Sequence, residues 1–161
     1  MTTIPETKSD VTQYEADFVI WVEQQAALLK QGCWGDLDVV HLIDEVEALG
    51  RSEKRALRSQ VIRVIKHLLK LNYQPGAFYY LNSWRSSVAE GRTQIKLILQ
   101  DSPSLKPYLA QVFAECYRDA VAEVVAETGL AEPVFPQKCP YSPAQVLDLK
   151  FLPGAGEASD G

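Results

Sequence analysis

The stretch from Leu42 to Tyr73 places the tightest constraint on how this chain can fold. It lies within the longest segment without proline, residues 6–74, and its apolar residues recur with a helical period. Apolar spacings of three, four and seven predict an amphipathic α-helix with one buried stripe. That stripe comprises Val39, Leu42, Ile43, Val46, Leu49, Leu57, Val61, Val64, Ile65 and Leu68. Gly50 interrupts the pattern, which is compatible with two nearly coaxial helices or with one helix kinked there.

Four further segments carry helical signals. They are residues 11–31, 83–100, 103–128 and 143–149. Gly32 and Gly129 are placed to end the first and third of these, because glycine adopts the left-handed conformation that follows many helices. Ser102 precedes a proline at a first helical position, which is a start signal. Ser142 opens a capping box, so a short helix is expected after it.

These signals predict an all-α protein, a bundle of about five helices with an irregular C-terminal strap and a short final helix. The strap begins near Leu130, where four prolines within eleven residues favour an extended path. We expect a flexible N-terminus over residues 1–10, one helical domain over 11–153 and a disordered tail over 154–161.

Composition narrows the functional classes. The 161 residues carry a net charge of −5, which argues weakly against a dedicated nucleic-acid-binding protein. Three widely spaced cysteines without a CxxC pair indicate neither a disulfide framework nor a zinc site, so we expect a reducing, cytoplasmic setting. No signal-peptide pattern and no apolar run long enough to span a bilayer are visible, so we expect no membrane association.

One polar group has the spacing of a catalytic or metal site. Asp38, His41 and Glu45 fall at i, i+3 and i+7, on one side of a helix, and Glu47 lies nearby. His67 would join them if its helix were an antiparallel neighbour. Carboxylates and imidazole at a helix boundary can hold a divalent metal or share a proton. The alternative is a structural hydrogen-bond network. No cofactor is predicted, and a divalent metal stays open.

A basic run and an aromatic group give further candidate binding residues. The candidates are Arg51, Arg55, Arg63, Lys66, Lys70, Trp84 and Arg92. The first five form a basic helix face that could contact phosphates, although pairing with acidic residues of neighbouring helices explains the same pattern. Trp84 and Arg92 could line a small-molecule cleft whose floor is the aromatic connector of residues 77–82. The alternative is a set of core aromatics that close one end of the bundle.

The order and spacing of several short motifs resemble those of a bacterial family catalogued as domain of unknown function 29. The motifs are Tyr14, Asp17 and Trp21; Leu42–Glu47 with Leu49–Arg51; His67–Lys70 with Tyr73–Pro75; Trp84 and Arg92; Ser102–Leu105; Tyr117 and Ala120; Glu127–Thr128; Phe135–Pro136; and Cys139–Tyr141. The resemblance implies a compact all-helical fold and brings no established activity, cofactor or catalytic residue. It does imply that Glu45, Glu47, Arg51, His67, Lys70, Trp84 and Arg92 belong to the family pattern.

Without a phosphate loop, a recognised triad or a complete metal-ligand set, we expect a non-catalytic cytoplasmic protein that acts by protein–protein association. Its partner is another protein or a second copy in a homodimer. Two alternatives remain at this point. One is a metal-assisted or acid–base enzyme that uses Asp38, His41, Glu45 and His67. The other is nucleic-acid binding through the Arg51–Lys70 face, which the acidic net charge disfavours.

Overall fold

A computed structural model describes residues 12–74 and 76–154. The chain divides into two compact units, Met1–Gly50 and Arg51–Gly161. The flexible N-terminus expected over residues 1–10 lies outside the described residues. So does the expected tail, apart from Gly154.

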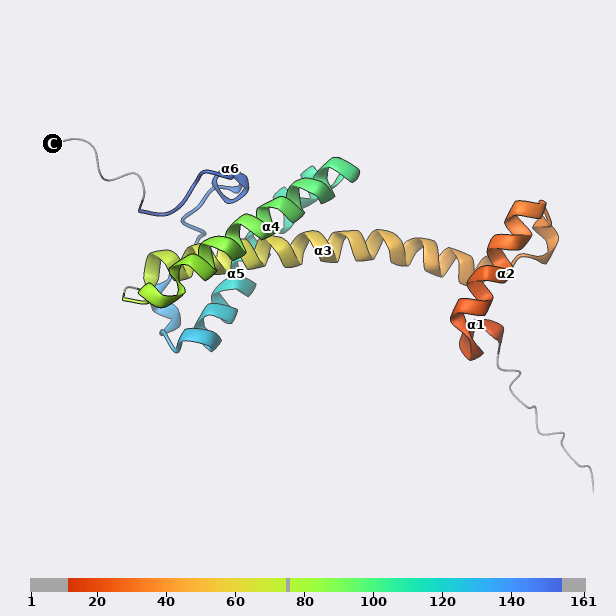
Figure 1. The fold of residues 1–161 in the computed structure, drawn as a ribbon, viewed down its shortest axis with the longest axis horizontal. Coiled ribbons are helices and arrows are strands. Elements are labelled where there is room, and N and C mark those ends of the chain that lie inside the picture. The colour runs from red at the N-terminus through yellow and green to blue at the C-terminus, as the bar shows by residue number, and fades with distance from the viewer. Residues whose placement is uncertain (1–11, 75, 155–161) are drawn as a thin grey trace, which may run out of the picture. The chain divides into compact units, whose positions relative to one another are not determined.

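The all-α prediction is confirmed: the described residues contain six α-helices and three short 3-10 turns, and no strand (Figure 1). The helices are α1 (Gln13–Ala16), α2 (Phe18–Gln31), α3 (Val39–Tyr73), α4 (Leu81–Asp101), α5 (Leu105–Thr128) and α6 (Pro143–Leu147). The 3-10 turns are Trp34–Asp36, Phe78–Tyr80 and Glu132–Val134.

The predicted helix over residues 11–31 is broken at Asp17. Asp17 is extended, with φ −153° and ψ 95°, so it ends α1 and caps α2. Its Oδ1 accepts a hydrogen bond from the Ile20 amide at 3.1 Å, which satisfies one of the free donors at the start of α2. The break turns α1 back against α2. At the other end, Gly32 adopts φ 72° and terminates α2, as predicted.

Helix α3 runs without interruption from Val39 to Tyr73, so Gly50 does not end it. Of the two arrangements that the sequence left open, a single helix through Gly50 is therefore the one present. The φ angle of Gly50 is negative, and a Cβ built there would meet no atom within 4 Å. Gly50 is thus an exposed helical glycine, which costs about 1 kcal/mol of helix propensity without breaking the helix.

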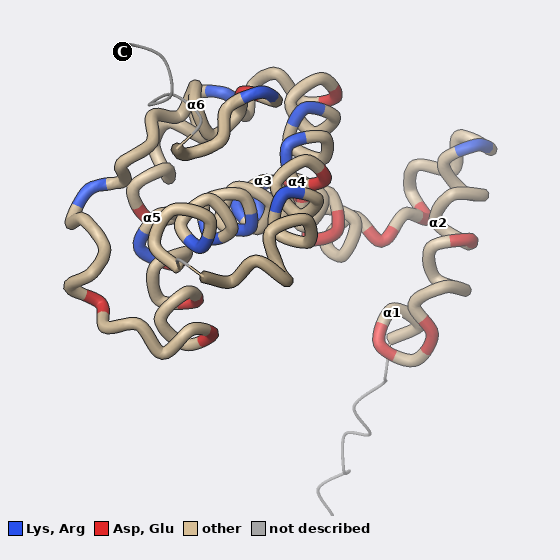
Figure 2. Tube along the Cα trace, turned by 60° about the vertical axis from the view of Figure 1, so that its left-hand side comes forward, with Lys and Arg blue, Asp and Glu red and all other residues tan. Residues whose placement is uncertain are grey.

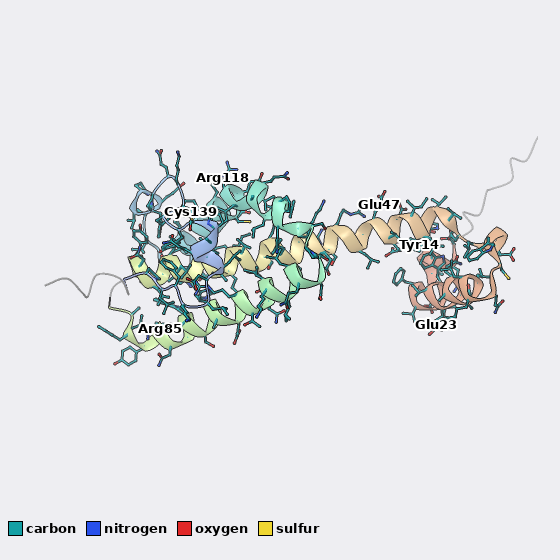
Figure 3. The ribbon with its side chains drawn as sticks, turned by 90° about the horizontal axis from the view of Figure 1, so that it is seen from above. Tyr14, Glu23, Glu47, Arg85, Arg118 and Cys139 are labelled. Atoms are coloured by element: carbon teal, nitrogen blue, oxygen red, sulfur yellow. The ribbon has the colours of Figure 1, made fainter. Side chains whose placement is uncertain are left out.

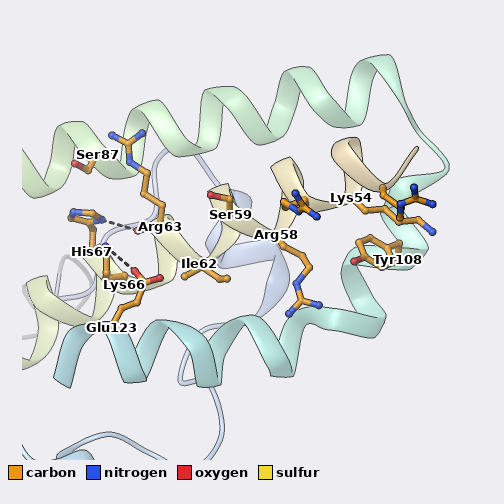
Figure 4. A pocket seen from close by; sticks show the side chains of 12 residues that line it. Lys54, Arg58, Ser59, Ile62, Arg63, Lys66, His67, Ser87, Tyr108 and Glu123 are labelled. Carbon is orange, nitrogen blue, oxygen red and sulfur yellow. Dashed lines mark hydrogen bonds and ion pairs between the residues drawn. The ribbon is translucent and has the colours of Figure 1, made fainter. Parts of the chain in front are cut away.

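The second unit contains the main hydrophobic core. Leu57, Val61, Val64, Ile65 and Leu68 of α3 are fully buried, as the sequence pattern predicts. They pack against a core set from α4, α5 and the strap that includes Val88, Ile95, Cys116, Ala120, Val124 and Val146. In close view, this part of α3 lies between α4 and α5 (Figure 4). Helices α4 and α5 therefore enclose the apolar stripe in this part of α3.

The strap over residues 130–153 is fixed to the core by buried polar side chains. The Tyr141 hydroxyl donates to the Leu68 carbonyl at 3.1 Å, and the Tyr117 hydroxyl donates to the Pro136 carbonyl at 2.5 Å. Burial raises the pKa of Tyr117 to about 12. The Ser142 capping box with Gln145 is present and opens α6 as predicted. That helix ends at Leu147, two residues earlier than expected.

Helix α5 begins at Leu105, whereas the sequence signal placed its first residue at Pro103. The carbonyls of Ser102 and Pro103 accept hydrogen bonds from the amides three residues later, at 3.0 and 3.2 Å. These i→i+3 bonds form a turn that precedes the α-helix. Gly129 ends α5 with φ 72°, in agreement with the prediction.

The first half of α3 contradicts the predicted core. Val39, Ile43, Val46 and Leu49 were expected to be buried, but each is more than half exposed. At about 100° per residue, the opposite side of the helix carries His41 and Glu45. This polar side, and not the apolar stripe, is the one that contacts α1. The periodicity correctly identified an apolar face but not whether this chain covers it.

The close approach of α3 and α4 at Gly91 gives a prediction. A Cβ on Gly91 would lie 2.7 Å from Val64 Cγ2, which is too short for a carbon–carbon contact. Gly91→Ala should therefore lower the free energy of unfolding by about 1–3 kcal/mol, despite the better helix propensity of alanine. In a Val64→Ala background the clash is absent, so the same change should become neutral or stabilising. Urea denaturation of the four proteins measures this, and an equal loss in both backgrounds would contradict the described packing.

Candidate functional site

In the first unit, the polar residues of the proposed catalytic group are bound to the N-terminal helices. Asp38 lies just before α3 and its Oδ2 accepts from Trp21 Nε1 at 3.0 Å and from His41 Nδ1 at 2.7 Å. Its backbone amide donates to Oε1 of the buried Gln25 at 2.8 Å. Asp38 thus joins α2 to the start of α3.

Tyr14 completes this arrangement. Its ring stacks on the His41 imidazole at 4.1 Å, and its hydroxyl donates to Glu45 Oε1 at 2.6 Å. Figure 3 shows Tyr14 on the side of the short helices that faces the start of α3. We refer to Tyr14, Trp21, Asp38, His41 and Glu45 as the N-terminal cluster. Sequence reasoning found three of its members and missed the two aromatic partners.

The electrostatics of the N-terminal cluster follow from these hydrogen bonds. The hydrogen bond from His41, and then that from Trp21, hold the pKa of Asp38 below its ordinary value of 3.8. The hydrogen bond to the Glu45 carboxylate raises the pKa of Tyr14. Asp38 is therefore ionised at neutral pH, and a carboxylate can only accept, so His41 Nδ1 carries a proton.

The structure does not gather a metal-ligand set. His67 belongs to the second unit, where its Nδ1 donates to the Arg63 carbonyl at 2.7 Å. Burial lowers the pKa of His67, so the neutral imidazole is favoured. Across residues 12–74 and 76–154, no three His, Cys, Asp or Glu side chains form a group that could hold a metal ion. Glu47, the remaining acidic candidate, is exposed on α3.

The low pKa of Asp38 gives a pH prediction for the first unit. A carboxylate with a depressed folded-state pKa stabilises the fold above its unfolded pKa and loses this contribution as pH falls through the folded value. The Trp21 indole N–H resonance should therefore shift with a midpoint below pH 3.8. NMR titration of the wild type and of Asp38→Asn measures this. The Asn variant should lose this titration step, because it has no carboxyl group at position 38. A midpoint at or above 3.8 in the wild type, or the same titration of the Trp21 resonance in the Asn variant, would contradict the hydrogen bond.

In the second unit, four of the basic candidates line a groove of about 780 Å³ between α3, α4 and α5, whereas Lys70 and Arg92 do not (Figure 4). Basic positions are concentrated on this part of α3 (Figure 2). The lining includes Arg51, Lys54, Arg55, Arg58, Arg63, Lys66, His67 and Tyr108, with Glu123 as its acidic member. The basic run is therefore on one accessible side of the bundle, as the sequence pattern indicates.

Carboxylates of α4 and α5 neutralise much of this basic groove. Arg58 reaches Glu115 at 3.1 Å and Asp119 at 3.4 Å, and Arg63 reaches Glu90 at 2.8 Å. Ion pairs with this degree of exposure each contribute about 0–1 kcal/mol to the free energy of unfolding. They nevertheless lower the positive potential that would attract a phosphate. Arg51 also takes part in an interaction, so its charge is not free.

Lys66 and Lys70 share one carboxylate. Lys66 reaches Glu127 at 2.8 Å and Glu123 at 2.9 Å, and Lys70 pairs with the same Glu127. Burial opposes the charged form of Lys66, but its two carboxylate partners outweigh burial and raise its pKa. The Lys70 ammonium also lies 5.8 Å from the centre of the buried Trp84 ring. Both lysines thus cross-link α3 to α5.

Arg92 is a structural anchor of the strap. It is almost fully buried in α4 and donates to three backbone carbonyls, those of Val146 at 2.8 Å, Phe151 at 2.8 Å and Gln145 at 3.0 Å. Burial lowers its pKa from the ordinary arginine value. All three partners belong to the C-terminal segment. This arginine therefore binds the chain's own backbone.

Replacing this arginine tests that role. Arg92→Met removes the donor from three backbone carbonyls. Each carbonyl that stays buried without a hydrogen bond to water lowers the free energy of unfolding by about 1–3 kcal/mol. We expect faster amide exchange over residues 143–152 and a loss of about 3 kcal/mol of unfolding free energy. Arg85→Met, at an exposed position of the same helix (Figure 3), is the matched control and should change neither quantity. Equal effects of the two variants would refute the anchoring role.

The first unit exposes an unusual amount of apolar surface. Of 17 large hydrophobic residues that are exposed in the described chain, 11 lie in residues 12–50. They are Phe18, Val19, Ile20, Val22, Leu29, Trp34, Val39, Val40, Ile43, Val46 and Leu49. Within residues 12–50, only the side chains of Trp21 and Gln25 are buried. Surfaces of this kind mark interaction sites in soluble proteins.

Comparison with known proteins gives a family and no activity. The model of the family described as domain of unknown function DUF29 matches residues 13–152, and the chain belongs to this family. No curated protein and no solved structure matches the chain. Within the described residues, no helix combines the length and the apolar character needed to cross a bilayer.

Proposed function

We propose that this DUF29 protein acts without catalysis, by binding another protein surface through the apolar residues of its first unit. The observation that carries the proposal is the exposed stripe of α3, where Val39, Ile43 and Val46 are each more than half exposed. Apolar surface left in water costs roughly 25 cal/mol per Å². A partner that covers it gains that free energy, which is the main driving force of protein association.

The size of the first unit supports the same proposal. The unit spans only residues 1–50, a size at which a chain buries a small share of its surface and is marginally stable by itself. The cysteines of the chain are free thiols, so no disulfide supplements this small core. Trp21 is its one buried hydrophobic residue among those described. Association supplies the missing burial.

The two alternative functions have less support. The acid–base or metal hypothesis needs Asp38, His41, Glu45 and His67 at one site. The first three are held by the aromatic residues Tyr14 and Trp21 of the first unit. His67 belongs to the second unit, where it binds a backbone carbonyl. The nucleic-acid hypothesis needs uncompensated cations, but Arg58, Arg63 and Lys66 are paired with carboxylates.

A photocrosslinking residue placed at Val46 tests the proposal in the cells that naturally make the protein. Val46 is 65% exposed, so the substitution is tolerated sterically and the probe faces whatever covers the stripe. We expect a covalent adduct to a protein, at a yield several times that of the control. The adduct's mass identifies its partner.

The control probe is placed at Gln94, an exposed polar position of α4. A second control combines the Val46 probe with Asp44→Asn, which removes a charge at a neighbouring exposed position without altering the apolar stripe. It should leave the adduct in place, whereas Ile43→Lys should abolish it. A Val46 probe that forms no more adduct than the Gln94 probe would rule out docking at this surface.

A further inference from the structure

Another groove of the second unit is largely apolar and differs in chemistry from the basic groove. It has a volume of about 460 Å³ and lies between the C-terminal half of α4, the start of α5 and the end of α6. Helix α6 packs beside α4 (Figure 1). The lining residues are Arg92, Ile95, Lys96, Leu99, Gln100, Pro103, Lys106, Leu147 and Leu149. We refer to this site as the leucine groove.

The apolar residues form the floor of the leucine groove and the lysines form its rim. Ile95 and Leu99 line it and are buried, whereas Lys96 and Lys106 line it and are exposed. Leu149 is 61% exposed, so its apolar surface is available to a ligand. A molecule in this groove therefore meets apolar side chains below and ammonium groups at the opening.

Arg92 fixes the wall that α6 and the following residues contribute. The backbone carbonyls to which it donates lie on both sides of Leu147 and Leu149 in the chain. The wall is thus held in place without a ligand, and small-molecule sites are usually preformed in this way. The volume of the groove also falls within the range of about 300–1,000 Å³ that such sites have. These properties favour a small molecule over a protein segment.

The leucine groove carries positive charge that no acidic residue of its lining offsets. None of the described residues that line it is acidic, and the nearby Asp148 is exposed outside the lining. In residues 12–74 and 76–154, no ion pair involves Lys96 or Lys106. The basic groove differs, because carboxylates of α4 and α5 pair with its Arg63 and Lys66. A complementary ligand has an apolar body and an anionic group at one end.

We propose that the leucine groove binds a small amphiphilic carboxylate from solution, with its alkyl chain on Ile95 and Leu99 and its carboxylate at Lys96 and Lys106. Burial of the alkyl chain is the main driving force. The ammonium groups donate charge-assisted hydrogen bonds to the carboxylate and select an anionic head group. The site lies in the second unit, so this proposal does not depend on the proposed function of the first.

An NMR titration of the isotope-labelled intact chain tests the proposal with three ligands of one chain length. Decanoate is the anionic probe, decanol is its neutral counterpart and decylammonium is its cationic one. We expect saturable shifts of the amides of residues 95–106 and 147–149 with decanoate. Decanoate should bind about fivefold more tightly than decanol, because two exposed ion pairs form with the lysines. Decylammonium should bind more weakly than decanol.

A double variant tests the role of the two rim lysines. Lys96→Gln with Lys106→Gln should remove the preference for decanoate over decanol and leave the affinity for decanol unchanged. Both positions are exposed, so the fold tolerates the change. Lys30→Gln with Lys138→Gln alters the net charge equally at exposed positions outside the lining and should keep the preference.

A second variant tests the apolar wall. Leu149→Ser removes apolar surface from the groove and should weaken decanoate and decanol alike, by roughly fivefold. Leu97→Ser removes an exposed hydrophobic residue of α4 that does not line the groove, so it should weaken neither ligand.

Three results would overturn the proposal. Equal affinities of the wild type for decanoate and decanol would exclude recognition of a carboxylate. Shifts confined to residues 12–50 would place the ligand on the apolar surface of the first unit instead. Binding to vesicles of anionic phospholipid, without shifts from free decanoate, would assign the rim lysines to a membrane surface.

Discussion

The Asp38 carboxylate decides which side of α3 the rest of the first unit covers. It accepts hydrogen bonds from the Trp21 indole and from the His41 ring, while its own amide donates to Gln25. These bonds, with the Tyr14–Glu45 bond, bind α1 and α2 to the polar side of α3. The apolar side is consequently left in water. The proposal for function depends on this choice of side, because the same stripe, if covered by α2, would be an ordinary core.

The two halves of α3 show what a covering helix changes. From Leu57 to Leu68 the stripe is enclosed by α4 and α5 and every apolar member is buried. From Val39 to Leu49 a stripe of the same chemical character remains exposed. Ion pairs such as Lys66–Glu127 and the strap anchor Arg92 reinforce the covered half. In the exposed half the printed interactions lie on the polar side, at His41 and Glu45, which is consistent with an apolar side completed by association.

Local chemistry allowed most of the fold to be predicted from the sequence. The helix ends at Gly32 and Gly129 and the capping box at Ser142 need only their own neighbours, and all three are present. The break at Asp17 was not predicted, because an aspartate is favoured both in the first turn of a helix and as the residue that caps a new helix. The pairing of Tyr14 with Glu45, 31 residues apart, has no local signal. Periodicity identifies an apolar face, but whether the chain covers that face is a tertiary property.

The central claim is that the exposed stripe of α3 is covered when the protein is assembled. Hydroxyl-radical footprinting of Val46 in the cells that naturally make the protein measures this directly. Val134 in the second unit, also exposed, serves as the internal reference. The account predicts that Val46 is protected relative to Val134 in the cells, where its partner is present. Reactivity of Val46 in the cells as high as that of Val134 would contradict it.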